Sequence, residues 1–376
     1  MKKLLFISNG HGEDLVAAEI IKKLKESTCL PARQAISLSG QTDISVFPLV
    51  GEGKVFEGLN VKILGARKKL PSGGFSLRNT WFLFKDILSG LIGSTLRNFK
   101  VLRNLKGQFD LVIAIGDIVP IIGALITKCP FIFVGVNKSS YYKWFGFNYT
   151  PWEKQLLQSY AKKVFVRDKA TEQDLQNHGI KVKSAEYVGN PLMDAMGGIK
   201  NEELRMRNEG VTIIGFLPGT RDDAKVNMED FAEVAREIIK MKPQGHEINF
   251  ITATTLDSVP TYIEKKTFAE VLTQANLIVG LSGTGNEQAA GSGIPLVSFY
   301  GRGSQYNIKF AEAQKQLLGE ALELVTDRQP LCVAASVWEL LRNPQRMEEM
   351  AKVGQEHMGE AGAIEKISHF IVGTLT

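Results

Sequence analysis

The chain has 376 residues, of which 44% are hydrophobic and 23% charged, so a disordered or fibrous protein is excluded and two domains of ordinary size are expected. Its three cysteines lie too far apart for a disulfide framework or a metal-ligand spacing, which favours a reducing, cytoplasmic location. No segment reaches the roughly 20 apolar residues of a membrane-spanning helix. Any membrane contact is therefore expected to be peripheral, on the inner face.

The net charge of +5 is unevenly distributed along the chain. Residues 60–108 hold ten Lys or Arg and one acid, Asp86, so this segment has a charge of +9 and the remainder −4. Aromatic and apolar side chains alternate with the basic ones. Two interpretations stay open: a helical surface that docks on an anionic membrane, or core-packed helices with a solvated basic back.

Short apolar runs alternate with longer amphipathic stretches along the whole chain. This alternation is typical of βαβ units, whose parallel sheets are buried on both faces and bind ligands at the carboxyl ends of their strands. The predicted strands are Leu4–Ile7, Leu111–Ile115, Phe131–Val134, Val164–Val166, Ile213–Phe216, Ile248–Ile251, Leu277–Val279 and Pro295–Phe299. The residues that follow each strand are the candidate site residues.

The first predicted strand is followed by Gly10, His11 and Gly12, and then by a predicted helix over 15–24. Glycines at such a turn let a substrate approach the backbone, and the positive end of the helix favours an anionic group. A tight βα turn without a ligand explains the same residues.

The third quarter of the chain contains two loops suited to phosphate. After the strand Ile213–Phe216, Gly219, Thr220 and Arg221 can direct backbone N–H groups and one fixed cation at a phosphate. After Leu277–Val279, the loop Ser282, Gly283 and Thr284 can hold a diphosphate with its backbone amides. Glu287 lies close enough along the following helix to accept hydrogen bonds from ribose hydroxyls.

Four motifs in register resemble the lipid-A-disaccharide synthase family. They are Gly189-Asn190-Pro191-Leu192-Met193-Asp194, Leu217-Pro218-Gly219-Thr220-Arg221, Ser282-Gly283-Thr284 with Glu287, and Gly293-Ile294-Pro295-Leu296-Val297. The resemblance implies an α/β protein of the GT-B class, with two Rossmann-like doubly wound domains facing across a cleft. It also implies a cytoplasmic inverting glycosyltransferase of lipid A biosynthesis, which transfers a sugar from a UDP-sugar to a lipid or lipid-linked acceptor.

The same resemblance implies the domain limits. Residues 1–188 would form the acceptor-binding domain and residues 189–356 the nucleotide-sugar domain. A new strand at Val211, after the small and charged residues 197–209, is consistent with a second sheet that begins there. The C-terminal segment 357–376 resembles the closing helix that packs back on the first domain.

Particular residues acquire roles from this resemblance. Asp117, at the end of the strand Leu111–Ile115, falls where the family has its proposed catalytic aspartate, and a strand's carboxyl end suits a general base. His11 is the rival base, and helix capping is the alternative role of Asp117. The expected donor-binding residues are Gly10, Gly12, Asn190, Gly219, Thr220, Arg221, Ser282, Gly283, Thr284 and Glu287. No metal or other cofactor is expected, and no nucleic-acid partner.

Two other functions remain open. A UDP-sugar 2-epimerase uses the same two-domain scaffold without a lipid, but needs several acids and a histidine around the sugar, which the sequence alone does not assemble. A non-catalytic nucleotide-sugar-binding protein would keep the UDP site only. The adjacent charges Arg167 and Asp168 are interpreted as solvated loop charge rather than as part of a site.

Overall fold

The computed structural model describes residues 2–26, 42–49, 53–65, 91–143, 148–194, 211–220, 223–303 and 305–375. These residues form two compact units. Unit 1 comprises Met1–Ser140, Phe145–Ala195 and Ala361–Thr376, and unit 2 comprises Tyr141–Trp144 and Met196–Glu360. Whether 1–188 and 189–356 fold as independent domains stays a prediction.

Unit 1 is built on a parallel sheet with the strand order β3-β2-β1-β4-β5-β6-β7. The central strands β1, β4 and β5 are largely apolar and, apart from the exposed Lys3 at the start of β1, buried, as a parallel sheet covered by helices requires. The strands are β1 Lys3–Ser8, β2 Asp43–Pro48, β3 Lys62–Ile63, β4 Leu111–Gly116, β5 Phe131–Gly135, β6 Ala161–Val166 and β7 Ala185–Tyr187.

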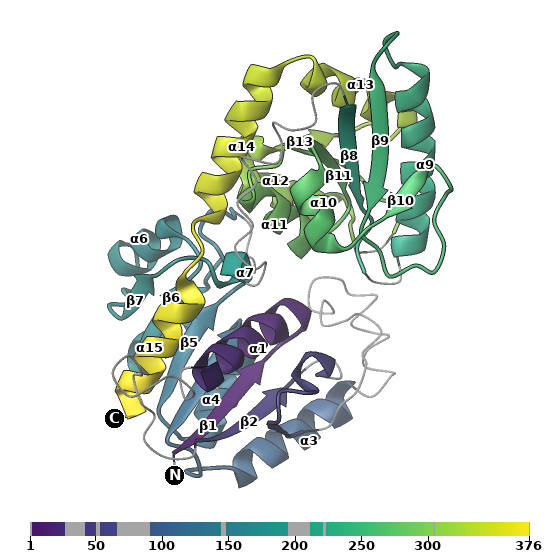
Figure 1. The fold of residues 1–376 in the computed structure, drawn as a ribbon. Coiled ribbons are helices and arrows are strands. Elements are labelled where there is room, and N and C mark those ends of the chain that lie inside the picture. Colours follow the sequence, from purple (N-terminus) through teal and green to yellow (C-terminus); the bar gives the residue numbers. More distant parts are fainter. Residues whose placement is uncertain are drawn as a thin grey trace. The chain divides into compact units, whose positions relative to one another are not determined.

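The helices of unit 1 form two layers. Because the crossover from β1 and the crossover from β4 leave the centre of the sheet in opposite directions, right-handed connections place α1 and α4 on opposite faces. Helix α1 packs against α15 on one face (Figure 1). On the other face α3 packs against α4 and α4 against α5, so these three helices form a contiguous row. These helices are α1 His11–Glu26, α3 Leu91–Asn104, α4 Ile118–Thr127, α5 Pro151–Tyr160, α6 Lys169–Asn177, α7 Pro191–Asp194 and α15 Ala363–Leu375, with η1 Lys54–Phe56.

Unit 2 contains a second parallel sheet, with the order β10-β9-β8-β11-β12-β13. Its core includes the stacked rings of Phe216, Phe231 and Phe250. The strands are β8 Val211–Leu217, β9 Glu247–Thr252, β10 Ile263–Lys265, β11 Leu277–Gly280, β12 Leu296–Phe299 and β13 Leu322–Val325. The helices are α9 Ala224–Lys240, α10 Phe268–Gln274, α11 Thr284–Gly291, α12 Ile308–Leu318, α13 Pro330–Leu341 and α14 Pro344–Met358, with η3 Gly319–Ala321.

The predicted α/β class with two Rossmann-like units is confirmed, and all eight predicted strands are present. Five further strands, β2, β3, β7, β10 and β13, were not predicted. Four of them are two to four residues long, and each of these four contains a charged residue within that length, so they lack a continuous apolar run.

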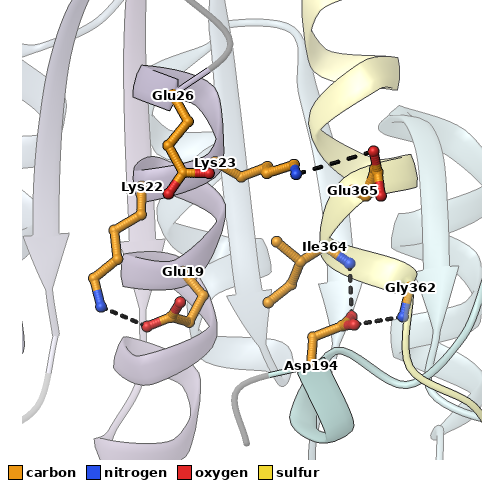
Figure 2. A pocket seen from close by; sticks show the side chains of 8 residues that line it. All are labelled: Glu19, Lys22, Lys23, Glu26, Asp194, Gly362, Ile364 and Glu365. Atoms are coloured by element: carbon orange, nitrogen blue, oxygen red, sulfur yellow. Dashed lines mark hydrogen bonds and ion pairs between the residues drawn. The ribbon is translucent and has the colours of Figure 1, made fainter. Parts of the chain in front are cut away.

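The C-terminal helix α15 is fixed to unit 1 by Asp194. The carboxylate of Asp194 accepts hydrogen bonds from the backbone N–H groups of Gly362 and Ile364, the latter at 2.8 Å (Figure 2). It thus satisfies N–H groups at the start of α15 that have no partner within the helix. Asp194 ends α7, so the motif Gly189–Asp194 anchors the returning segment of the chain.

Candidate active site

The first candidate site lies at the carboxyl ends of β1 and β4, which pair in parallel. This end of the sheet of unit 1 is called the first edge, and the corresponding end of the sheet of unit 2 the second edge. Asp117 follows β4 and caps α4, where its Oδ1 accepts a hydrogen bond of 2.9 Å from the N–H of Val119. From the end of β1, the side-chain amide of Asn9 donates to both carboxylate oxygens of Asp117, at 3.1 Å each. Asp117 is therefore held as a helix cap while remaining partly exposed.

Gly116 and Glu13 explain how this edge is packed. Gly116 has φ +129°, a conformation that favours glycine, and an added Cβ would lie 3.1 Å from Cγ of Glu13. Glu13 is buried, and its Oε1 accepts a hydrogen bond from the side-chain amide of Asn137, which follows β5. The edge thus contains a second carboxylate, which is buried, next to the strand end that precedes Asp117.

Asp14 is a third acid at this edge. Its side chain is buried in the first turn of α1, and the Oγ of Ser8 donates a hydrogen bond to it. Burial disfavours the charged carboxylate and raises the pKa of Asp14 to about 7, although the Ser8 hydrogen bond lowers it in part. Asp14 therefore exchanges a proton near neutral pH.

Four more charged groups are buried near the ends of β5 and β6. Lys138 Nζ lies 2.7 Å from Glu153 Oε2, and both side chains are almost fully buried. Arg167 is completely buried and donates to the carbonyl oxygen of Val136 at 3.0 Å, while Asp168 caps α6 through the N–H of Thr171. The interpretation of Arg167 and Asp168 as solvated loop charge is wrong, because both directly follow β6 and are buried in the interior.

The second candidate edge lies at the carboxyl ends of β8 and β11 in unit 2. The N–H of Leu281 donates to the carbonyl of Leu217 at 2.9 Å, which brings the loop with Gly219 beside the loop Ser282–Thr284. Gly219 has φ +82°, so the turn after β8 favours glycine. Thr284 begins α11, and Glu287 lies buried in the first turn of this helix.

A buried network of neutral side chains fixes this loop. Gln314 donates to the carbonyls of Ser282 and Gly283 at 3.1 and 2.9 Å. Its Oε1 accepts from Asn286 and from the hydroxyl of Tyr306, at 2.8 and 2.6 Å. Burial raises the pKa of Tyr306 well above its usual range, so this hydroxyl stays protonated. Amide and hydroxyl groups therefore hold the carbonyls of this loop. Asn286, Tyr306 and Gln314 were not predicted, because only their contacts reveal them.

The remaining predicted site residues are placed as follows. Gly10 precedes α1 with φ +136°, and Gly12 lies in its first turn. His11 begins α1, but its side chain lies outside the described part of the chain, as does all of Arg221. Asn190 belongs to unit 1, where it is fully buried and accepts from the N–H of Leu192. The ligand-binding role of each of these residues stays a prediction.

Within the described ranges, no group of three or more His, Cys, Asp or Glu side chains is arranged to hold a metal ion. The expectation that the chemistry needs neither metal nor other cofactor stays a prediction.

None of the helices in the described part of the chain combines the length and apolar character that crossing a bilayer requires. Of the basic segment 60–108, residues 66–90 lie outside the described part of the chain.

Solved structures of other proteins match the chain over nearly its full length. The UDP co-structure of S. aureus MnaA covers 100% of this chain and 97% of its own, with a TM-score of 0.63 and 16% identity. The structure of a putative UDP-N-acetylglucosamine 2-epimerase from Listeria monocytogenes covers 98% of this chain and 96% of its own. Its TM-score is 0.61 and its sequence identity 15%. The structure of CalG4, the calicheamicin glycosyltransferase, covers 98% of both chains, with a TM-score of 0.61 and 13% identity. No family model and no curated protein matches the chain.

At these identities the likeness shows the fold, which is that of GT-B structures. The resemblance to lipid-A-disaccharide synthase is wrong, and with it the transfer of a sugar to a lipid acceptor in lipid A biosynthesis. The similar structures are mostly UDP-N-acetylglucosamine 2-epimerases, and no lipid-A-disaccharide synthase is among them. The motifs that indicate it form loops at the carboxyl ends of β8 and β11 and a helix anchor, features that do not specify an acceptor.

Proposed function

We propose that the protein is an enzyme that binds a UDP-sugar and inverts the configuration of the sugar at C2. The observation that carries the proposal is the set of carboxyl groups at the edge of unit 1, formed by Glu13, Asp14 and Asp117. Similar structures from three named organisms bear the name UDP-N-acetylglucosamine 2-epimerase, which supports this choice of reaction.

The proposal assigns nucleotide binding to the edge of unit 2. The backbone N–H groups of Ser282, Gly283 and Thr284 at the start of α11 suit a diphosphate, because the N-terminus of a helix favours anions. Glu287, one turn along the helix, suits the ribose hydroxyls as an acceptor of charge-assisted hydrogen bonds. The names of two similar structures that contain UDP or UDP-N-acetylglucosamine support this class of ligand.

The proposal assigns proton transfer to the edge of unit 1. Inversion at C2 needs the C2–H bond to break on one face of the sugar, its electron pair forming a C1=C2 double bond while the C1–O bond to UDP breaks. UDP then adds back at C1 as C2 accepts a proton on the other face, so a base and an acid are both needed and no atom is gained or lost overall. Asp117, partly exposed and oriented by Asn9, suits the base. Asp14, with a pKa of about 7, can hold the proton that is returned. His11 remains the rival of Asp117.

Two measurements test the proposal in sequence. Isothermal titration calorimetry with UDP should detect binding to the full chain. Anion-exchange chromatography of UDP-N-acetylglucosamine incubated with the protein should then show its C2 epimer accumulating to a constant ratio. UDP binding without any epimer would refute the proposed reaction but leave the nucleotide site, whereas the absence of both would refute the proposal as a whole.

A further inference from the structure

The two helical layers of unit 1 differ in surface charge. On the α1–α15 layer acids and bases alternate, and several are paired: Lys22 with Glu19 at 2.6 Å, and Lys23 with Glu365 at 3.9 Å (Figure 2). The residues around the groove in Figure 2 comprise both signs of charge. This layer therefore has little attraction for an anionic or a cationic partner.

The α3–α4–α5 layer has no exposed acid in its three helices. Its only acid is Glu153, which is buried against Lys138. On α3, Arg97, Lys100 and Arg103 recur every three residues and are all exposed, while Leu102 on the opposite side is buried. None of these three cations forms an ion pair with another described residue. The outer surface of α3 is thus a stripe of positive charge that no acid in the described part of the chain neutralises.

The same layer exposes large apolar and aromatic side chains. Trp152 and Tyr160 on α5 are 77% and 60% exposed, and Ile122 on α4 is 36% exposed. Because α3 packs on α4 and α4 on α5, these side chains belong to one continuous layer with the cations. Trp and Tyr favour the boundary between water and lipid headgroups, where an apolar ring and a polar tip are both satisfied.

We propose that the α3–α4–α5 layer docks on an anionic lipid bilayer. The exposed cations of this layer, which has no exposed acid, complement the negative membrane surface. The exposed Trp and Tyr side chains distinguish this partner from double-stranded DNA, whose stacked bases offer them no apolar face. Docking is peripheral and reversible, since it uses side chains on folded helices. The proposal does not depend on the proposed function, because none of its residues belongs to either candidate edge.

Co-sedimentation with vesicles tests the proposal, with phosphatidylcholine alone compared with phosphatidylcholine containing phosphatidylglycerol. The protein should bind the anionic vesicles at low salt and dissociate as salt shortens the range of the attraction. The triple substitution Arg97→Gln, Lys100→Gln and Arg103→Gln should reduce binding by about tenfold or more, because each cation near such a surface contributes up to about fivefold. Trp152→Ala, at an exposed position, should reduce binding without changing the fold.

The matched control removes three cations from the other layer, by Lys22→Gln, Lys23→Gln and Lys366→Gln, and should bind as the unmodified protein does. An equal loss in both triple variants would mean that only net charge matters and would overturn the proposal. So would equal binding to neutral and anionic vesicles, binding to neither, or retention on double-stranded DNA in the absence of vesicle binding. Circular dichroism of each variant establishes that the fold is intact.

Discussion

The carboxyl edges of the two sheets are built from different chemistry. In unit 1, carboxylates and buried cations follow β1, β4, β5 and β6, and Asp14 has a pKa near neutrality. In unit 2, the loop after β11 is held by neutral groups, with Gln314 bonded to two of its carbonyls. Charged groups in a buried setting can move protons, whereas a neutral network fixes a backbone shape that does not change with pH. This difference is the basis of the proposed division of roles, with proton transfer in unit 1 and ligand binding in unit 2.

The largest effect is expected from Asp117→Asn. Removal of the base at the first edge should lower turnover by about 10² to 10⁴ and leave UDP affinity unchanged. The substitution keeps the size of the side chain and can still accept from Val119 as a cap. Steady-state kinetics and UDP calorimetry on the same preparation measure both quantities. If this variant keeps near-normal turnover while His11→Ala loses it, the two residues exchange roles.

Asp14 should make the stability of the protein depend on pH. Its pKa is raised from 3.8 to about 7 on folding, so the folded state binds the extra proton between these values. Stability should therefore fall as pH rises from about 4 to about 7 and then level off, with a total loss of up to about 4 kcal/mol. Asp14→Asn should remove this slope and be the more stable protein above pH 7.

Urea unfolding of the unmodified protein and Asp14→Asn at pH 5, 6 and 8 measures this slope. The control is Glu26→Gln, at an exposed position at the end of the same helix. This substitution should leave the dependence of stability on pH unchanged. Parallel pH profiles for the unmodified protein and Asp14→Asn would show that Asp14 titrates normally and would remove it as the proton donor.

The smallest of the three effects is expected at the second edge. Glu287→Ala should weaken UDP binding by the loss of a charge-assisted hydrogen bond, about 1.5 to 3 kcal/mol. Because Gln314 and Tyr306 hold the loop independently of Glu287, the fold of unit 2 should be retained. Calorimetry at pH 6 and pH 8 measures the affinity. An unchanged affinity would exclude Glu287 as a residue that binds the nucleotide. The control is Glu320→Ala, at an exposed position of the same unit, which should leave UDP affinity unchanged.

The sequence predicts the central strands and the small-residue loops well, because a doubly buried strand needs a continuous apolar run. It predicts the short strands β3, β7 and β10 poorly, since a few residues with a charge have no such pattern. The sequence also fails to predict which charged residues are buried. Arg167 and Asp168 read as solvated until the sheet shows that they follow β6 into the interior, and Glu13 and Asn137 are brought together across 124 residues. Similarly, the loops after β8 and β11 do not specify a reaction, because the resemblance to a lipid-A-disaccharide synthase that they carry is wrong.

The most direct test of the account follows UDP-N-acetylglucosamine by proton NMR in D₂O with the full chain. If carboxyl groups at the first edge remove and return the proton at C2, the C2 epimer should form and the solvent should supply the proton, so deuterium should appear at C2. Asp117→Asn should slow both changes together. Unchanged substrate, or UDP set free without epimer or deuterium at C2, would contradict the division of roles between the two edges.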